Sequence, residues 1–295
     1  MKKMKWMQIA LTASLLIMVS TVATQATVLR AFVSSAGNDA NAASNCPQTT
    51  PCKTFAGAFP VVTPGGELVA LDTSGYGPLT INKAITVAAV PGATAFVVAA
   101  TGTSGFTVSA GATDLIVLRN INFNGSGAAN TTGVQVSSGK VTIEDCKFAQ
   151  LSIGINVHSA DKTFVQNCSF NGNGTGLVSV TSKVTAENLT VSNNTVGFAA
   201  DGDGGSQNVP PTGPTQLEIS GGVIVNNGTA FSMANAGTHQ TVPAAACNGV
   251  NIFLRGNSDI RGNAVFAGFS GSSDHQAGCG AQVSTGSFGN QLSPP

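Results

Sequence analysis

The sequence predicts an all-β solenoid, a single-stranded parallel β-helix with about 21–22 residues in each coil. The first observation is a repeat: similar units begin at Gly133, Gly154, Gly176 and Gly197, which are 21 or 22 residues apart. The second is that each unit holds three short runs of alternating apolar and polar residues, with Gly or Asn between the runs. The third is the absence of helical apolar spacing. Each unit is therefore expected to be one coil of three strands, which buries its core only when it is stacked on its neighbours.

Parallel stacking of such coils places equivalent residues in columns along the axis of the solenoid. One inner column is predicted to contain Phe123, Phe148, Phe170, Val191 and Ile224, and a second Val117, Ile143, Val165, Ala186 and Ile219. The outward column beside the second is predicted to be Ile116, Thr142, Phe164, Thr185 and Glu218.

Asn and Asp recur in the turns. Asn120, Asp145, Asn167 and Asn188 occupy one turn column, and Asn193 aligns with Asn226 in a later one. These residues suit left-handed backbone, and stacked amides can hydrogen-bond along the axis. We interpret the abundance of Asn as structural.

The first 26 residues have the pattern of a secretory signal peptide. A basic start is followed by an apolar run from Ile9 to Val22, too short to span a bilayer, and by a small-residue site that ends at Ala26. We expect cleavage after Ala26 and a mature chain, 27–295, that is secreted, periplasmic or held at the cell surface. No second long apolar segment is present, so no membrane span is expected in the mature chain.

The composition also excludes some partners. Charged residues make up only 9% of the chain. Removal of the signal peptide takes away three of the 13 basic residues and leaves the 13 acidic ones. This balance lacks the basic excess typical of nucleic-acid binding, so no nucleic-acid partner is expected.

Six cysteines in an exported chain suggest disulfides. Cys46 and Cys52 are close enough in sequence to close a small loop, and Cys247 and Cys279 are candidates for a second bridge. Cys146 and Cys168 fall in one inward column, one coil apart. They form either a pair of buried thiols or a bridge between coils.

The segment before the regular coils contains Phe32-Val-Ser-Ser-Ala-Gly-Asn-Asp, Pro51-Cys-Lys-Thr-Phe and Pro64-Gly-Gly-Glu. These motifs resemble the N-terminal segment of right-handed parallel β-helix proteins of the pectate-lyase-like superfamily. The resemblance implies an entering strand, a short capping helix at Lys53-Thr-Phe, and a turn at Pro64-Gly-Gly into the first coil. A cap is physically required, because the end of a solenoid exposes apolar core and strand edges.

The expected organisation is one domain of about ten right-handed coils after the signal peptide 1–26. Its parts are a cap and first coil at 27–79, coils at 80–265, and a C-terminal cap and tail at 266–295. Insertions near 201–215 and 234–249 interrupt two coils at the same place, so they should emerge from one face. Such loops either build a binding site or cover the sheet beneath them.

Two charged columns are the candidate binding residues. Lys140, Lys162 and Lys183 align before the second run of each coil, and Arg119, Glu144, Gln166 and Glu187 align after it. The lysines could hold an acidic glycan by charge, with Arg119 and Glu144 paired. Alternatively, both columns are solvated turn residues.

Catalytic residues cannot be assigned from the sequence. Lyases of this fold need a base and usually calcium held by clustered acids, and the outward positions show no such cluster. Asp201 and Asp203 begin like a calcium loop without its later ligands, so no cofactor is expected, with calcium as the only option. His239, in the second insertion, is a candidate general base, and Asp72 or Asp114 could fall beside the lysines. The mature chain has no Trp and one Tyr, Tyr76, which argues against a dedicated sugar-stacking cleft.

Three functional hypotheses follow. The first is a non-catalytic, exported surface or adhesion-type protein that binds a polysaccharide or a cell-surface protein. The second is a carbohydrate-active enzyme, a lyase or hydrolase of acidic polysaccharide, with its groove around the charged columns. The third is a purely structural scaffold.

Overall fold

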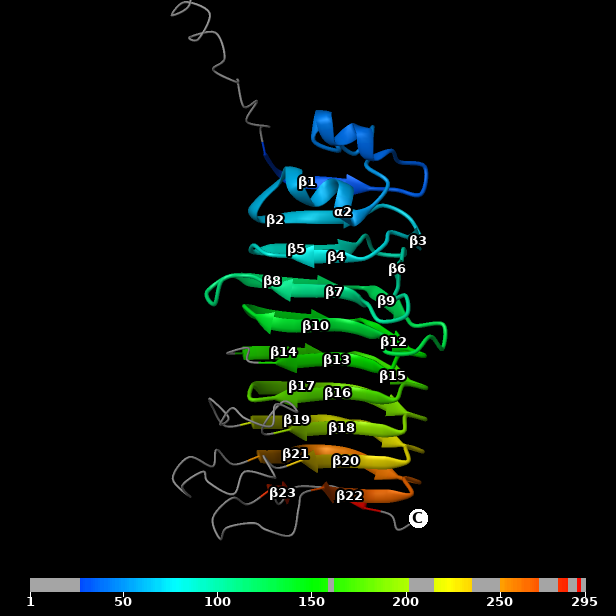
Figure 1. The fold of residues 1–295 in the computed structure, drawn as a ribbon, viewed down its shortest axis with the longest axis vertical. Coiled ribbons are helices and arrows are strands. Elements are labelled where there is room, and N and C mark those ends of the chain that lie inside the picture. The colour runs from blue at the N-terminus through cyan, green and yellow to red at the C-terminus, as the bar shows by residue number, and fades with distance from the viewer. Residues whose placement is uncertain are drawn as a thin grey trace, which may run out of the picture.

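The computed structural model describes residues 27–158, 162–201, 215–234, 250–270, 281–285 and 291–292, and these form a parallel β-helix (Figure 1). The predicted signal peptide, 1–26, lies outside the described residues. Every strand pair is parallel, and equivalent strands of successive coils lie side by side along the long axis (Figure 1). The predicted fold class is thus confirmed.

Within the described residues, one face of the solenoid is an eight-stranded sheet, here called the first face. Its strands are β4 (Leu79–Ile81), β7 (Ser104–Ser109), β10 (Thr132–Ser138), β13 (Ile153–His158), β16 (Thr175–Val180), β18 (Val196–Asp201), β20 (Thr229–Ala234) and β22 (Val265–Ser270).

A second sheet of 16 strands folds around the other two sides of the described solenoid. The second face comprises β1 (Val28–Val33), β2 (Val62–Ala70), β5 (Ile85–Ala89), β8 (Leu115–Arg119), β11 (Lys140–Glu144), β14 (Lys162–Gln166), β23 (Ala281–Thr285) and the first halves of β17 (Lys183–Ser192), β19 (Thr215–Val225) and β21 (Val250–Arg261). The third face comprises β3 (Ser74–Gly75), β6 (Ala95–Val98), β9 (Ile121–Asn124), β12 (Lys147–Ala149), β15 (Ser169–Asn171), β24 (Gln291–Leu292) and the second halves of the three long strands.

The glycines that begin the repeat units are required by close packing between coils. A Cβ added to Gly133 would lie 2.5 Å from the carbonyl oxygen of Gly154, and one added to Gly176 would lie 2.5 Å from that of Gly197. Neither backbone atom can move without breaking the parallel ladder, so a larger residue is excluded at these positions. The repeat that predicts the fold is therefore a consequence of the coil spacing.

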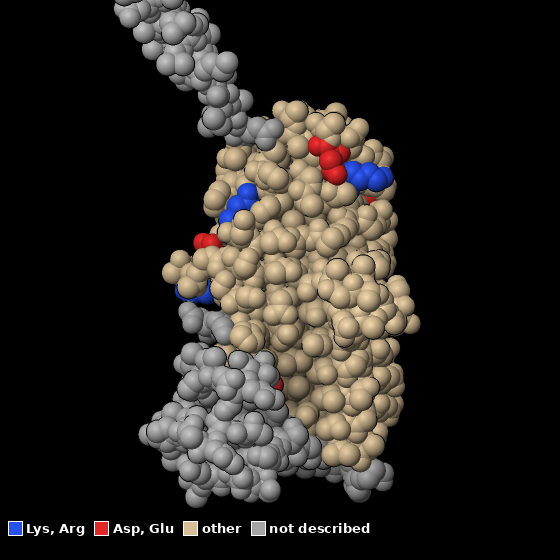
Figure 2. All heavy atoms as spheres, viewed as in Figure 1, with Lys and Arg blue, Asp and Glu red and all other residues tan. Residues whose placement is uncertain are grey.

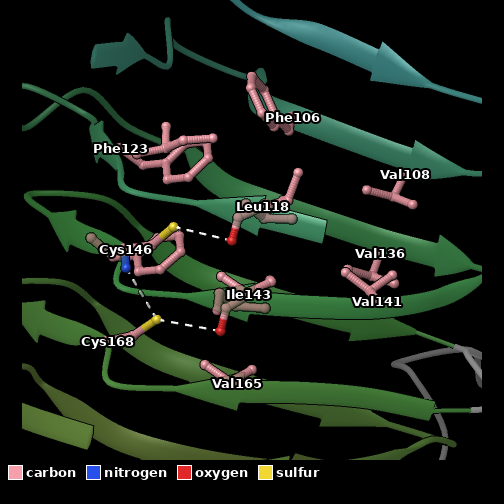
Figure 3. Close-up of a cluster of buried hydrophobic side chains, with 14 of the residues drawn as sticks. Phe106, Val108, Leu118, Phe123, Val136, Val141, Ile143, Cys146, Val165 and Cys168 are labelled. Carbon is pink, nitrogen blue, oxygen red and sulfur yellow. Dashed lines mark hydrogen bonds between the residues drawn. The ribbon is translucent and has the colours of Figure 1, made fainter. Parts of the chain in front are cut away.

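The interior is filled by columns of apolar side chains (Figure 3). Phe123, Phe148 and Phe170 stack with centroids 5.0 and 4.8 Å apart, and Val191 and Ile224 continue this column, as predicted. The second predicted column is wrong at its first member, because Leu118, not Val117, pairs with Ile143. The register with Ile116 and Leu118 inside keeps the charged Arg119 in solvent, whereas the predicted register would bury it.

The turn residues Asn120, Asp145, Asn167 and Asn188 adopt left-handed backbone, with φ between 51° and 56°. Asn193 and Asn226 do the same, but they do not form the amide ladder. The residues after them do, and the ladder comprises Asn173, Asn194, Asn227 and Asn263, each at most 8% exposed. In each step an Asn donates from Nδ2 to the next Oδ1 over 2.9 Å and from its backbone N–H to the same oxygen. The left-handed residue turns the chain so that its successor points inward.

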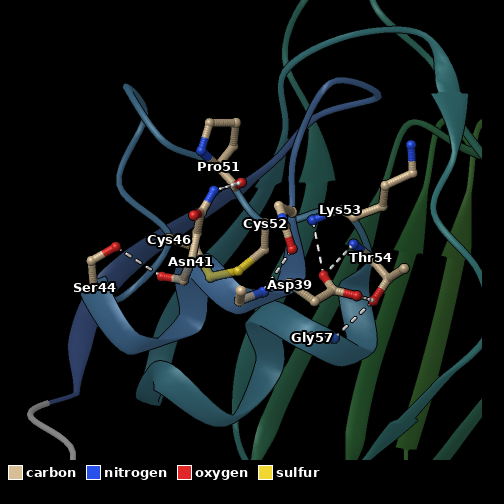
Figure 4. The surroundings of a disulfide bond; sticks show 11 residues. Asp39, Asn41, Ser44, Cys46, Pro51, Cys52, Lys53, Thr54 and Gly57 are labelled. Atoms are coloured by element: carbon tan, nitrogen blue, oxygen red, sulfur yellow. Dashed lines mark hydrogen bonds between the residues drawn. A yellow bond between two sulfur atoms is a disulfide. The ribbon is translucent and has the colours of Figure 1, made fainter.

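The N-terminal end is closed by a cap that contains the 3₁₀ helix η1 (Asp39–Ser44), the helix α2 (Phe55–Ala58) and the 3₁₀ helix η2 (Phe59–Val61). Thr54 caps α2 by accepting from Gly57 N–H, and Asp39 accepts from the backbone N–H groups of Lys53 and Thr54 (Figure 4). The Phe55 ring packs on Phe106 at 5.7 Å, so the helix covers the open core. The predicted capping helix is present.

Two further features of the cap were examined against the sequence. Cys46 and Cys52 form a disulfide (Figure 4). Pro64-Gly-Gly does not form a turn but lies within β2, where Gly65 has φ +80° and the pairing of β1 with β2 shifts register between Val28 and Arg30. The glycine allows a bulge in the strand that the resemblance placed as a turn.

We expect Asn194→Ala to lower the free energy of unfolding by roughly 3 kcal/mol, because the N–H groups of Asn173 lose their buried acceptor. The matched control is Asn193→Ala at the exposed neighbour, which loses only a left-handed preference worth about 1 kcal/mol. Urea unfolding followed by circular dichroism measures both. Equal losses for the two variants would contradict the ladder's role.

A second expectation concerns Asp72, whose carboxylate accepts hydrogen bonds from Tyr76, Ser35 and Ser34. Burial acts to raise the pKa of Asp72, but these bonds outweigh it and lower the pKa from 3.8 to about 2. The folded-state pKa is depressed, so this stabilisation is present above pH 4 and is lost as the pH falls to about 2. We expect Tyr76→Phe to melt at a lower temperature than the wild type at pH 7, with a gap that narrows by pH 2. A gap independent of pH would show that the phenol–carboxylate bond does not contribute.

Candidate functional site

Three lysines form an exposed row on the second face, here called the lysine ladder: Lys140, Lys162 and Lys183. They begin strands β11, β14 and β17, Lys140 pairs directly with Lys162, and the register of β14 with β17 places Lys183 next. All three are exposed. Neighbouring strands lie about 4.8 Å apart, so the ladder presents one amine per coil. The structure therefore confirms the predicted alignment.

The other charged column lies on the same face, at the far end of the same strands. Arg119 forms an ion pair with Glu144, as the sequence suggested, and Gln166 Nε2 donates to the second oxygen of Glu144 over 2.8 Å. The side chain of Glu144 is only 13% exposed. Glu187 follows Gln166 in this column. Glu144 is thus neutralised within the column and contributes little negative field outside it.

A central column runs between the two charged ones. It contains Val117, Thr142, Phe164, Thr185 and Glu218, so Val117 replaces the predicted Ile116, which is buried. Phe164 is half-buried and lies between the hydroxyl-bearing Thr142 and Thr185. Glu218 forms an ion pair with Arg255 over 3.3 Å. The sequence placed the charged columns at turns, whereas the structure makes them the two margins of one face.

Distance separates the lysine ladder from the acids. Lys140 and Glu144 are four residues apart on one strand, a span of about 13 Å. Charges in solvent are screened over about 8 Å at physiological salt. The ladder's own amines are closer than that, so their fields add while the acidic column does not cancel them.

The ladder lies beside the turn that carries both insertions. Segments 202–214 and 235–249 join β18 to β19 and β20 to β21, between the first and second faces. Their flanking strands are in register, with Asp201 beside Ala234. The two insertions therefore start at the same place in successive coils. His239 and Asp203 lie outside the described residues, so their predicted roles stay predictions.

The two aspartates expected near the lysines are occupied elsewhere. Asp72 belongs to the cap, with Tyr76. Asp114 precedes β8, its carboxylate accepts from Gly111 N–H over 2.8 Å, and its carbonyl accepts from Lys140 N–H. Across the described ranges, no group of three or more His, Cys, Asp and Glu side chains is placed to hold a metal.

The first face has a different character. Its outward central residues carry no charge; they are Thr80, Thr107, Gln135, Asn156, Val178, Ala199 and Ser232. Figure 2 shows this as a broad tan surface, with blue and red atoms toward the edges of the described part. At its upper end a groove of about 290 Å³ lies against α2, lined by Ala56, Phe59, Pro78, Leu79, Thr80, Ser104 and Thr107.

Cys146 and Cys168 are free, buried thiols rather than a bridge (Figure 3). Cys146 Sγ points to the Leu118 carbonyl at 3.7 Å and Cys168 Sγ to the Ile143 carbonyl at 3.6 Å. Burial raises the pKa of Cys146 well above its ordinary value, and so do the hydrogen bond to Cys168 and the charge there. Both thiols are therefore protected from thiolate chemistry. Cys247 and Cys279 lie outside the described residues.

We expect neither Cys146 nor Cys168 to react with iodoacetamide in the folded protein, because the thiols are inaccessible. Both should be alkylated once guanidinium unfolds the chain without reductant. Peptide mass spectrometry reads each site, and Cys46 and Cys52 should resist alkylation until reductant is added. Resistance of Cys146 and Cys168 in the unfolded, unreduced chain would mean that they form a bridge.

The geometry thus defines a parallel β-helix with a charged, strand-borne outer face. Residues 95–293 match the family described as the right handed beta helix region, and the chain belongs to this family. A solved structure titled "Crystal structure of pectate lyase Pel9A" is similar, with a TM-score of 0.52 and 15% identity, covering 88% of this chain and 80% of that one. A structure titled "Rhamnogalacturonan lyase" matches with a TM-score of 0.42 and 11% identity, covering 79% of this chain and 74% of that one. A search of curated proteins finds no match.

The pectate-lyase-like resemblance inferred from the N-terminal motifs is therefore confirmed for the fold. In the described part of the chain, no helix combines the length and apolar character that crossing a membrane requires. The sequence did not reveal that Phe164 and the two charged columns share one face. The spacing was a usable signal, since Lys140, Thr142 and Glu144 alternate along one short strand and must point the same way.

Proposed function

We propose that this protein is an exported, non-catalytic binding module that holds an acidic polysaccharide on its second face. The lysine ladder carries the proposal: three exposed amines, one per coil, lie far from the nearest acidic column. A polymer with a carboxylate on each sugar unit matches such a row in charge and in repetition. The signal-peptide pattern and the disulfide between Cys46 and Cys52 support export.

Phe164 supplies the apolar contact that a sugar ring needs. It lies two residues along β14 from Lys162, so its side chain points to the same side of the sheet. An aromatic ring gives a large contact area at a small entropic cost. A uronate paired with Lys162 would place a ring face over Phe164.

The carboxylates of this face support binding rather than catalysis. Proton abstraction beside a uronate requires a free base and an electrophile that stabilises the developing charge. Glu144 is engaged by Arg119 and Gln166, and Glu218 by Arg255. The pectate lyase of similar fold is named for an acidic polysaccharide, and this directs the choice of the first ligand to test.

Polygalacturonate binding to the immobilised mature protein tests the proposal. We expect Lys162→Glu to weaken binding about tenfold, because it replaces one favourable charge with a repulsive one. Lys147→Glu on the third face is the matched control and should bind like the wild type, since Lys147 is exposed on a different side. Fully methyl-esterified polygalacturonate, which lacks the charges, should not bind, and added salt should weaken binding.

Two results would contradict the proposal. Equal binding of the charged and esterified polymers would show that the lysines are not the recognition element. Release of unsaturated products or new reducing ends, lost in Lys162→Ala, would show instead that the face is the active site of a carbohydrate-active enzyme.

A further inference from the structure

The lysine ladder has defined ends. Leu115 pairs with Lys140 on one side and is 64% exposed, and Gln216 pairs with Lys183 on the other. Neither neighbour carries a charge. The positive row therefore spans three coils and no more.

A polyanion can cross this face along the strands or along the solenoid axis. Along β11 a chain would pass from Lys140 over Thr142 to Glu144, and along β17 from Lys183 over Thr185 to Glu187. Either path ends at a carboxylate column, which repels the ligand. The path along the axis meets an amine at every coil and stays about 13 Å from that column, beyond the screening length.

The central column fixes the position of the middle sugar. Phe164 is the aromatic residue beside Lys162, whereas Thr142 and Thr185 accompany Lys140 and Lys183. The row thus has an aromatic contact at its centre and hydroxyl groups at both sides. Strand-borne side chains hold these positions rigidly, so the spacing of the row is fixed before the ligand arrives.

We infer that the second face binds an acidic glycan parallel to the solenoid axis and reads three consecutive anionic sugars, with the middle ring on Phe164. This inference rests on the proposed function, whose ligand class it shares. It adds the direction of the chain and the number of charged units.

Oligogalacturonates of two to six units test it by isothermal titration calorimetry with the full mature chain. We expect affinity to rise by up to about fivefold for each unit until three amines are engaged, which requires three or four units, and then to level off. Phe164→Ala should weaken the trimer while leaving the salt dependence unchanged, because it removes contact area and no charge. Equal affinity from two to six units, or a continuous rise to six, would overturn the inference.

Extension of the ladder gives a second, gain-of-function test. Leu115→Lys and Gln216→Lys each add an amine at an outward position of the same column, and the plateau should move to one unit longer. Thr190→Lys, which adds an exposed lysine on the third face, is the control and should leave the plateau unchanged. An unmoved plateau in both ladder variants would contradict the inference. If the polymer binds but no length break appears, this inference alone fails; if no polygalacturonate binds, the proposed function fails with it.

Discussion

In-register hydrogen bonding between parallel strands of successive coils is the constraint on which this structure depends. It places every residue directly over its equivalent one coil away, so each column repeats one kind of environment. Inside, this produces the phenyl stack and the buried Asn ladder, whose members satisfy each other's polar groups. Outside, the same rule aligns Lys140, Lys162 and Lys183, although like charges repel. Exposure to water makes that repulsion small, so the fold tolerates a row that a ligand can use.

A solenoid of this kind must be closed at its ends, because its interior is apolar throughout. Here α2 places Phe55 over the first coils, and the loop closed by Cys46 and Cys52 packs beside it. Asp39 connects the two by accepting from the backbone at the start of the helix. This cap adds few residues but covers core that would otherwise meet water. The candidate site lies several coils away, in the regular part of the solenoid, where the geometry repeats most closely.

Fold and function are separable in this architecture, since a parallel β-helix supplies rows of outward positions and leaves their chemistry open. On the second face the acids form ion pairs with arginines, while the lysines are left to solvent and face no acid nearer than about 13 Å. On the first face the outward central positions are uncharged. The distribution of charge between faces, rather than the backbone, is what favours the binding of an acidic chain over its cleavage.

The sequence by itself determined the repeat, the three strands of each coil, the capping helix after Lys53, the column of Phe123, Phe148 and Phe170, and the alignment of the lysines. Each of these follows from local pattern and from a period that is visible in the chain. Only the tertiary structure decided the register of β8, where Leu115 to Leu118 are all apolar and fit either side of a strand. It also decided that Asn194 rather than Asn193 joins the buried ladder, because the left-handed turn residue redirects the one after it. That the charged columns share one face is likewise a property of the folded coils, since the two margins of a sheet are defined only when its strands are paired.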